Sequence, residues 1–167
     1  GRLGKSPARY DQTQLIYWQK QALLQLSNDK LWTWLAPKLQ DLVPEDVKFE
    51  FIELMRGTIC FPEEAVVWAA ILLSDNVTLN YSSDTKKCLR EVDPRYWQTL
   101  LNLLDEYSEF KTLIKSLQQQ LNLKAKALFT PLRLALTGRQ DGPELAKIFS
   151  LLGNVKIRER ILHAQNS

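Results

Sequence analysis

The chain has 167 residues, of which 45% are apolar and 25% are charged, and its formal net charge is +3. This composition is typical of a globular protein, and a chain of this length buries roughly 70% of its unfolded surface, enough for one core or two small ones without a metal or a disulfide. No apolar run approaches the roughly 18 residues of a membrane-spanning helix. We therefore expect no membrane partner. Cys60 and Cys88 are the only cysteines, which suits a reducing compartment, so we expect a cytoplasmic protein.

Apolar residues in the first half of the chain recur with helical spacing, and no run alternates as a strand would. Asp11 and Gln14 form a capping-box pattern before the first apolar stripe, and Asn28 opens a second. Pro37 is expected to end that second helix, because proline removes a backbone donor. The pattern predicts helices at residues 15–26, 28–36, 44–57 and 62–72.

The polar segment 74–84 interrupts this periodicity and is the expected junction between two helical units. Beyond it, Asp93 and Ser108 each precede an amphipathic stripe. Pro131 and Pro143 sit where proline suits the first turn of a helix, and Gly138 and Gly153 fall where a helix would stop. We therefore predict an all-α fold of two small helical bundles, residues 1–74 and 75–167, with later helices at 94–104, 108–121, 131–138, 143–153 and 154–164.

The chain contains five tryptophans, whose rings could pack in a core or stack on RNA bases. Most lie on apolar helical faces, so core packing is the expected role. Trp34 is the expected exposed exception, because it is two residues from Trp32 and so on another side of the helix. The set is Trp18, Trp32, Trp34, Trp68 and Trp97.

The polar turn at residues 137–142 is the most informative local feature. It is expected to expose Thr137, Arg139 and Gln140 beside backbone N–H groups that lack helical partners, and such a turn can contact an extended polar ligand such as RNA. An ordinary helix corner is the alternative. Residues 124–167 hold 8 Lys plus Arg against 3 Asp plus Glu. That excess is compatible with an anionic partner or with a solvated basic helix.

The C-terminal string places Pro-Leu-Arg, Ala-Leu-Thr-Gly, a Gly-Pro turn and Leu-Leu-Gly in that order between residues 131 and 153. It closely resembles the C-terminal signature of bacterial glutamyl-tRNA synthetases, and residues 5–11 resemble that family's entry into its anticodon-binding half. The resemblance implies a helical anticodon-binding cage that acts as a monomer on glutamate tRNA, with glutamine tRNA as a possible second partner. It also implies a parent enzyme that uses ATP and magnesium, neither of which this chain is expected to bind.

The resemblance further implies which residues contact RNA. Arg133, Arg139 and Lys147 would supply charge to the phosphate backbone, although a structural ion pair is an equal alternative for Arg133. The turn would face bases through backbone groups and small apolar contacts. Gly142 replaces a hydroxyl-bearing residue of a relative, so a side-chain hydrogen bond is missing there. The implied surface comprises Arg133, Thr137, Gly138, Arg139, Asp141, Gly142, Pro143, Leu145 and Lys147, with Arg56 and Thr58 in the first bundle.

Thr58 departs from the pattern of some family members. In those members an arginine two residues after a Leu-Met-Arg sequence selects the third anticodon letter, and here Leu54-Met55-Arg56 is followed at that distance by threonine. Either Arg56 takes over that contact, or discrimination between glutamate and glutamine tRNAs is relaxed.

No catalytic or metal-binding pattern is found in the sequence. His163 is the only histidine, and paired acids such as Glu63 and Glu64 are better interpreted as helix-end charges than as acid-base dyads. The family's two ATP-handling signatures are also missing, so we expect no aminoacylation by this chain alone. A helical protein-interaction module without an RNA role is the alternative function, and an independent enzyme is a more distant one.

Overall fold

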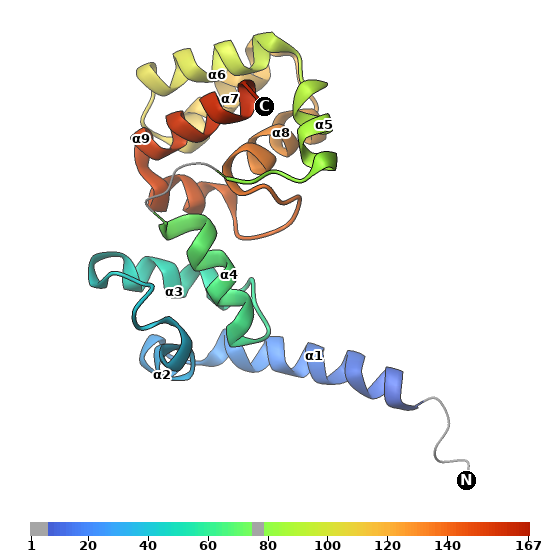
Figure 1. The fold of residues 1–167 in the computed structure, drawn as a ribbon, viewed down its shortest axis with the longest axis vertical. Helices are drawn as coiled ribbons and strands as arrows, with labels where there is room; N and C mark the ends of the chain where they lie inside the picture. The colour runs from blue at the N-terminus through green and yellow to red at the C-terminus, as the bar shows by residue number, and fades with distance from the viewer. Residues whose placement is uncertain (1–6, 75–78) are drawn as a thin grey trace. The chain divides into compact units, whose positions relative to one another are not determined.

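The computed structural model describes residues 7–74 and 79–167, so part of the 5–11 motif and part of the expected junction lie outside the described residues. The described part is built of helices and contains no strand, which confirms the predicted all-α class (Figure 1). The chain divides into two compact units, residues 1–70 and 71–167. That the functional subdomains meet between residues 74 and 75 stays a prediction.

The first unit is made from α1 (Pro7–Gln25), α2 (Asn28–Leu39), the short 3-10 helix η2 (Glu45–Val47), α3 (Lys48–Arg56) and most of α4 (Pro62–Leu73). Ser27 caps α2 by accepting a hydrogen bond from the Lys30 N–H at 3.3 Å, which satisfies one of the free donors of the first turn. α2 packs on α3, and the core gathers large apolar side chains that are at most 2% exposed. These are Leu31, Leu35, Leu39, Phe51, Ile52, Met55 and Ile59.

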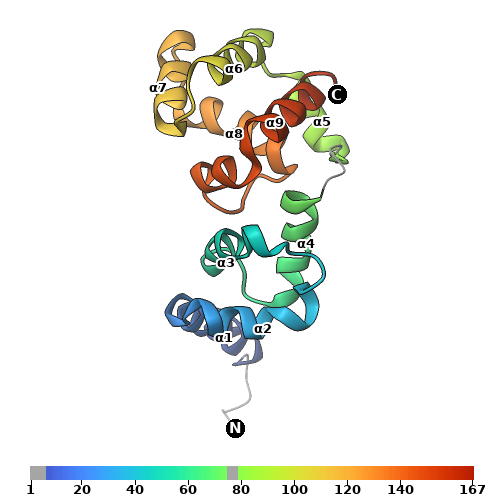
Figure 2. The ribbon, with the colours of Figure 1, turned by 90° about the vertical axis from the view of Figure 1, so that its left-hand side faces the viewer.

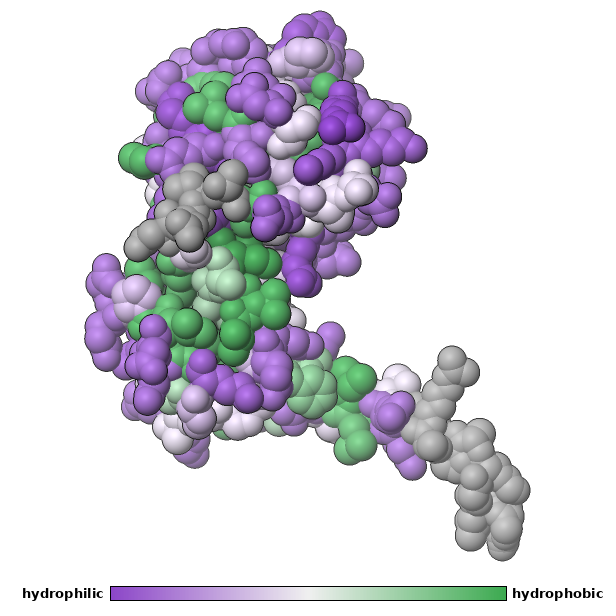
Figure 3. Space-filling view, in the orientation of Figure 1, coloured by the Kyte–Doolittle hydropathy of each residue, from purple (hydrophilic) through white to green (hydrophobic). Residues whose placement is uncertain are grey.

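α1 leaves much of its apolar surface uncovered. Trp18 is 64% exposed and Leu15 is 66% exposed, whereas Leu23 near the end of the helix is buried. The core role predicted for Trp18 is therefore wrong, because only the last turns of α1 reach the rest of the unit. Figure 3 shows a small green apolar patch partway along α1, among hydrophilic residues. Trp68 and Trp97 are buried as predicted, whereas Trp32 and Trp34 are both partly exposed. The prediction that Trp34 is the exposed exception is therefore wrong, because Trp18 is the most exposed of the set.

Two prolines lie inside helices rather than at their ends. α2 continues past Pro37 to Leu39, and α8 (Ala125–Thr137) carries Pro131 in its middle. Both sequence-based helix boundaries are therefore wrong. Packing explains the tolerance at Pro131, which is itself buried among the leucines of α8, because burial of that face offsets the loss of one backbone hydrogen bond.

The second unit consists of α5 (Ser83–Arg90), α6 (Pro94–Glu106), α7 (Phe110–Leu121), α8 and α9 (Leu145–Gln165) (Figure 2). α6 and α7 pack as a hairpin, and α9 packs against both α6 and α8. α5 was missed from the sequence because its eight residues contain little apolar surface. The core contains side chains that are at most 2% exposed, among them Leu100, Leu103, Leu113, Leu117, Leu132, Leu136, Ile148 and Ile161.

α9 is broken at Gly153, as the sequence predicted. Its φ of 79° and ψ of 163° lie outside the helical region, and the positive φ favours glycine over residues with a side chain. Asn154, the next residue, donates from its amide to the Leu104 carbonyl at 3.1 Å, which fixes the start of the following helical segment against α6. The two segments predicted at 143–153 and 154–164 therefore correspond to the two halves of α9, except that α9 begins at Leu145. Pro143 precedes the Glu144 cap, so its predicted place in the first turn is wrong.

Candidate nucleic-acid interface

The elbow, residues 138–144, joins α8 to α9 and contains five of the residues that the sequence singled out, with four more in the adjoining turns of α8 and α9. Gly138 ends α8 in the left-handed conformation, with a φ of 74°, and its N–H donates to the Leu134 carbonyl at 2.8 Å. This is the helix stop that the sequence predicted, because glycine adopts that conformation without strain. The chain can thus leave the helix sharply and present the following residues as a loop.

Thr137 holds the first part of the elbow from the inside. Its hydroxyl donates to the Arg133 carbonyl at 2.8 Å and accepts from the Arg139 N–H at 3.0 Å, while the side chain is only 3% exposed. The expectation that Thr137 is an exposed donor is therefore wrong. The Thr137 hydroxyl makes its hydrogen bonds with backbone groups of the same helix end, as is common for threonine there.

Arg133 closes the elbow from the other side. Its Nη1 donates to the Pro143 carbonyl at 2.8 Å, so one guanidinium links α8 to the residue that precedes the α9 cap. Burial lowers the pKa of Arg133 and the nearby charge of Asp141 opposes that shift, yet a guanidinium stays protonated in proteins. This hydrogen bond goes to a backbone carbonyl, whereas the ion pair considered from the sequence would have required a carboxylate partner for Arg133.

Tyr81 and Arg160 were not identified from the sequence, and both support the same corner. The Tyr81 hydroxyl donates to the Ala135 carbonyl at 2.7 Å, and Arg160 Nη1 donates to the Leu136 carbonyl at 2.8 Å. The last carbonyls of a helix lack intrahelical partners, so these two side chains satisfy them. Burial raises the pKa of Tyr81, which keeps the phenol protonated and able to donate. No local motif in the sequence marks either residue.

The tip of the elbow, residues 139–142, reaches solvent, and so does Glu144 at the start of α9. Arg139, Asp141 and Gly142 are exposed, and so is Lys147 in the first turns of α9, where it lies 3.8 Å from the Glu144 carboxylate. In contrast, the side chains of Pro143 and Leu145 are buried. The structure therefore brings the second-bundle candidates together at one corner, with a charged tip and a packed base.

Arg56 and Thr58 belong to the first unit. The Arg56 guanidinium donates to the carbonyls of Leu23 and Leu26, to the Asn28 side chain and to Glu53, and the side chain is 16% exposed. Arg56 therefore fastens the end of α1 to α2 and α3. Thr58 is partly exposed and donates its hydroxyl to the Leu54 carbonyl at 2.8 Å, which leaves the oxygen lone pairs as acceptors.

We expect Tyr81→Phe to destabilise the second unit by about 1–2 kcal/mol, because a buried carbonyl loses its donor while the ring remains. Urea unfolding followed by circular dichroism measures this change. Tyr17→Phe is the matched control, since Tyr17 is 56% exposed and should lose almost nothing. Equal losses in the two variants would contradict the proposed role of the Tyr81 hydroxyl.

Neither a metal site nor a membrane span is found in the described part of the chain. Across those residues, no group of three or more His, Cys, Asp or Glu is arranged to hold a metal ion. None of the described helices has the length and apolar content to cross a bilayer.

Comparison with known proteins decides the family. Residues 16–165 match the anticodon binding domain family. The chain belongs to the anticodon binding domain family. This anticodon binding domain is 38% identical over 96% of its length to glutamate–tRNA ligase 2 of Nitrosococcus oceani, and 34% identical over 97% to glutamate–tRNA ligase 2 of Coxiella burnetii. It spans 34% and 35% of those two proteins, about a third of their length.

A solved structure shares the fold of this anticodon binding domain. The glutamate tRNA ligase from Elizabethkingia meningosepticum, crystallised in complex with its amino acid, superposes with a TM-score of 0.74 at 19% identity. The superposition covers 91% of this chain and 32% of the ligase. The helical anticodon-binding fold implied by the sequence resemblance is thereby confirmed.

Proposed function

We propose that this domain binds the anticodon arm of glutamate tRNA and contributes tRNA specificity to a glutamate–tRNA ligase. The proposal is supported by the ligase names of the relatives and by the elbow, whose exposed tip is held from beneath by Thr137 and Arg133. A rigid corner of this kind presents backbone groups to unstacked bases at little entropic cost on binding.

Arg133 can serve the elbow and the RNA at once. Its Nη1 is used by the Pro143 carbonyl, and within the described residues no hydrogen bond occupies Nη2 or Nε. Those donors would meet a phosphate, while Arg139 and Lys147 add charge at the exposed tip. The buried side chains of Pro143 and Leu145 would act by shaping the elbow, and its backbone and Gly142 would contact the bases.

The salt dependence of the binding affinity tests whether the ligand is a nucleic acid or a protein. If the elbow neutralises phosphates of a single-stranded loop, the logarithm of the association constant should fall by roughly 0.7 per log unit of salt for each phosphate contacted. With three cations in contact, we expect a slope of about −2 in fluorescence titrations of glutamate tRNA. A protein-interaction module would bind its partner through apolar contacts, and a slope near zero for tRNA would overturn the RNA assignment.

Thr58 is proposed to relax selection at the third anticodon letter. Arg56 is engaged in fastening α1, which favours the second of the two alternatives drawn from the sequence. We expect glutamate and glutamine tRNAs to bind within about fivefold of each other, roughly the effect of one exposed polar contact, and Thr58→Arg to widen the gap. Titration of both tRNAs measures this. A wide gap in the wild type, unchanged in Thr58→Arg, would contradict the proposal.

The parent enzyme is proposed to activate glutamate with ATP and magnesium in a catalytic half that this chain does not contain, acting as a cytoplasmic monomer. The relatives, which are about three times as long, support this division. The exposed apolar side chains of α1 would be covered by that catalytic half. Incubating the isolated domain with glutamate, ATP and tRNA should give no ester, and ester formation would overturn this part of the proposal.

A further inference from the structure

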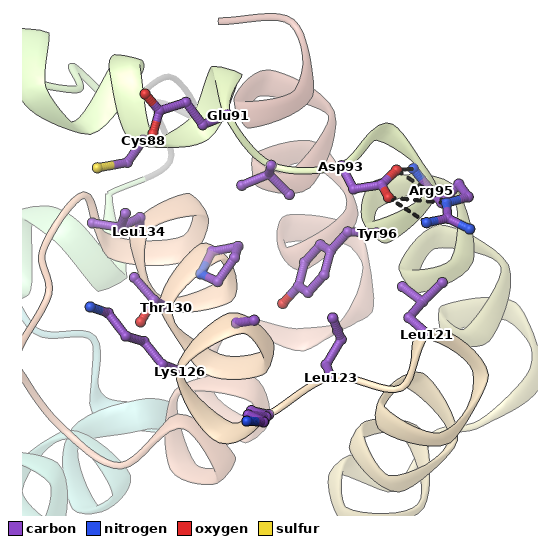
Figure 4. A pocket seen from close by; sticks show the side chains of 14 residues that line it. Cys88, Glu91, Asp93, Arg95, Tyr96, Leu121, Leu123, Lys126, Thr130 and Leu134 are labelled. Carbon is purple, nitrogen blue, oxygen red and sulfur yellow. Dashed lines mark hydrogen bonds and ion pairs between the residues drawn. The ribbon is translucent and has the colours of Figure 1, made fainter.

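A cavity of about 590 Å³ opens in the second unit between α5, the start of α6, the end of α7 and α8 (Figure 4). Its walls are mainly apolar and include Val92, Leu121, Leu123 and Leu134. The ring of Tyr96 is also part of the wall, and its hydroxyl is already used by the Leu128 carbonyl. The cavity is large enough for a compact ring system, and its lining favours an apolar one.

The charges at the mouth of the cavity are unevenly matched. Asp93 accepts from Arg95 at 2.7 Å, and this contact lowers the pKa of Asp93, so the two charges neutralise each other. Glu91 lies on the α5 side beside Cys88, and Lys126 lies across from it on α8. Lys124 and Lys126 line the cavity, and within the described residues neither makes an ion pair.

Lys124 is also the cap residue of α8, and no side chain caps that helix. The free N–H groups of the first turn add to the positive potential of the two lysines. The α8 side of the cavity thus combines an apolar wall with two lysines that form no ion pair with any described residue, and this combination complements an anion attached to an apolar body.

We propose that this cavity binds a small organic anion with a compact apolar body. The body would lie against Leu121, Leu123 and Leu134, and the anionic group would lie beside Lys124 and Lys126. The proposal does not depend on the RNA role of the elbow. A splayed RNA nucleotide is a different occupant, and protection of Cys88 by glutamate tRNA would identify it.

Cys88 provides a local signal, because it lines the cavity and is partly exposed, while Cys60 is buried in the first unit. The probe is 8-anilinonaphthalene-1-sulfonate, and its neutral counterpart is N-phenyl-1-naphthylamine. The rate of Cys88 alkylation by iodoacetamide is measured by peptide mass spectrometry. When the free sulfonate concentration is ten times the dissociation constant, alkylation of Cys88 should slow by about tenfold, because only about a tenth of the cavities are unoccupied.

Removing the two cations should weaken sulfonate binding by about tenfold in Lys124→Gln/Lys126→Gln, the combined effect of two exposed ionic contacts. Lys111→Gln/Lys115→Gln is the matched control on the exposed side of α7 and should bind as the wild type does. Ala127→Trp should abolish the protection by filling the mouth, and because Ala127 is exposed on a helix, this variant should fold normally.

Three results would overturn the proposal. The first is the absence of Cys88 protection by the sulfonate, and the second is equal protection by the neutral amine, which would show that charge has no role. The third is protection by glutamate tRNA alone, which would assign the cavity to RNA. Binding of tRNA that is unaffected by Ala127→Trp, together with failure of the sulfonate, would leave the RNA function intact and reject only the cavity site.

Discussion

Replacing Arg133 with alanine is expected to weaken binding of glutamate tRNA by about 10- to 100-fold. The variant loses a charge-assisted hydrogen bond to the Pro143 carbonyl, and contacts of that kind contribute about 1.5–3 kcal/mol. Without it the elbow has one fewer link between α8 and the start of α9, and any phosphate contact of the same guanidinium is lost too. Fluorescence titration at fixed salt measures the change in affinity.

Two further variants separate the effect of positive charge on tRNA affinity from the effect of the guanidinium geometry of Arg133. Lys111→Ala removes one positive charge from an exposed position on α7 and should change affinity by no more than a few-fold, because exposed charges act weakly through solvent. Arg133→Lys keeps the charge but loses the planar fork, so an intermediate loss is expected. If Arg133→Ala and Lys111→Ala weakened binding equally, the elbow would have no special role.

Replacing Trp97 with alanine is expected to destabilise the second unit by about 3–5 kcal/mol, because a large buried ring leaves a cavity behind. Trp97 is 3% exposed on α6, and its ring contacts that of Tyr96 edge to face at a centroid distance of 5.1 Å. Trp18→Ala should cost less than about 0.5 kcal/mol, because that ring is mostly in water. Urea unfolding followed by circular dichroism measures both.

This pair of variants tests whether α1 is uncovered in the isolated domain. A loss from Trp18→Ala comparable to that from Trp97→Ala would mean that the Trp18 ring is packed in solution, against a second copy or against the rest of the chain. Repeating the unfolding at several protein concentrations separates those cases, because stability that depends on association rises with concentration.

The sequence was sufficient where a local rule decides the structure. Gly138 ends a helix and Gly153 breaks one, since few other residues tolerate a positive φ at those places. Asp93 caps α6 by accepting from the Arg95 N–H, and the amphipathic stripes of α6 and α7 bury most of their leucines as the spacing predicted, while Leu101 and Leu121 stay partly exposed. The position of the elbow followed from the same signals.

The sequence did not predict the structure where contacts between residues far apart in the chain determine it. Pro131 looked like a helix start, yet burial of the surrounding leucines carries α8 straight through it. Thr137 looked like a free donor, but its partners are the Arg133 carbonyl and the Arg139 N–H. Tyr81 and Arg160 act across 54 and 24 residues of sequence, so no local pattern could link them to the last turn of α8.

A ribonuclease footprint of glutamate tRNA with the domain tests whether the elbow presents its tip to the anticodon. We predict protection confined to the anticodon loop with the wild type, and loss of that protection with Arg133→Ala at the same protein concentration. An unprotected anticodon loop with the folded wild-type domain, or a footprint confined to another part of the tRNA, would contradict the account.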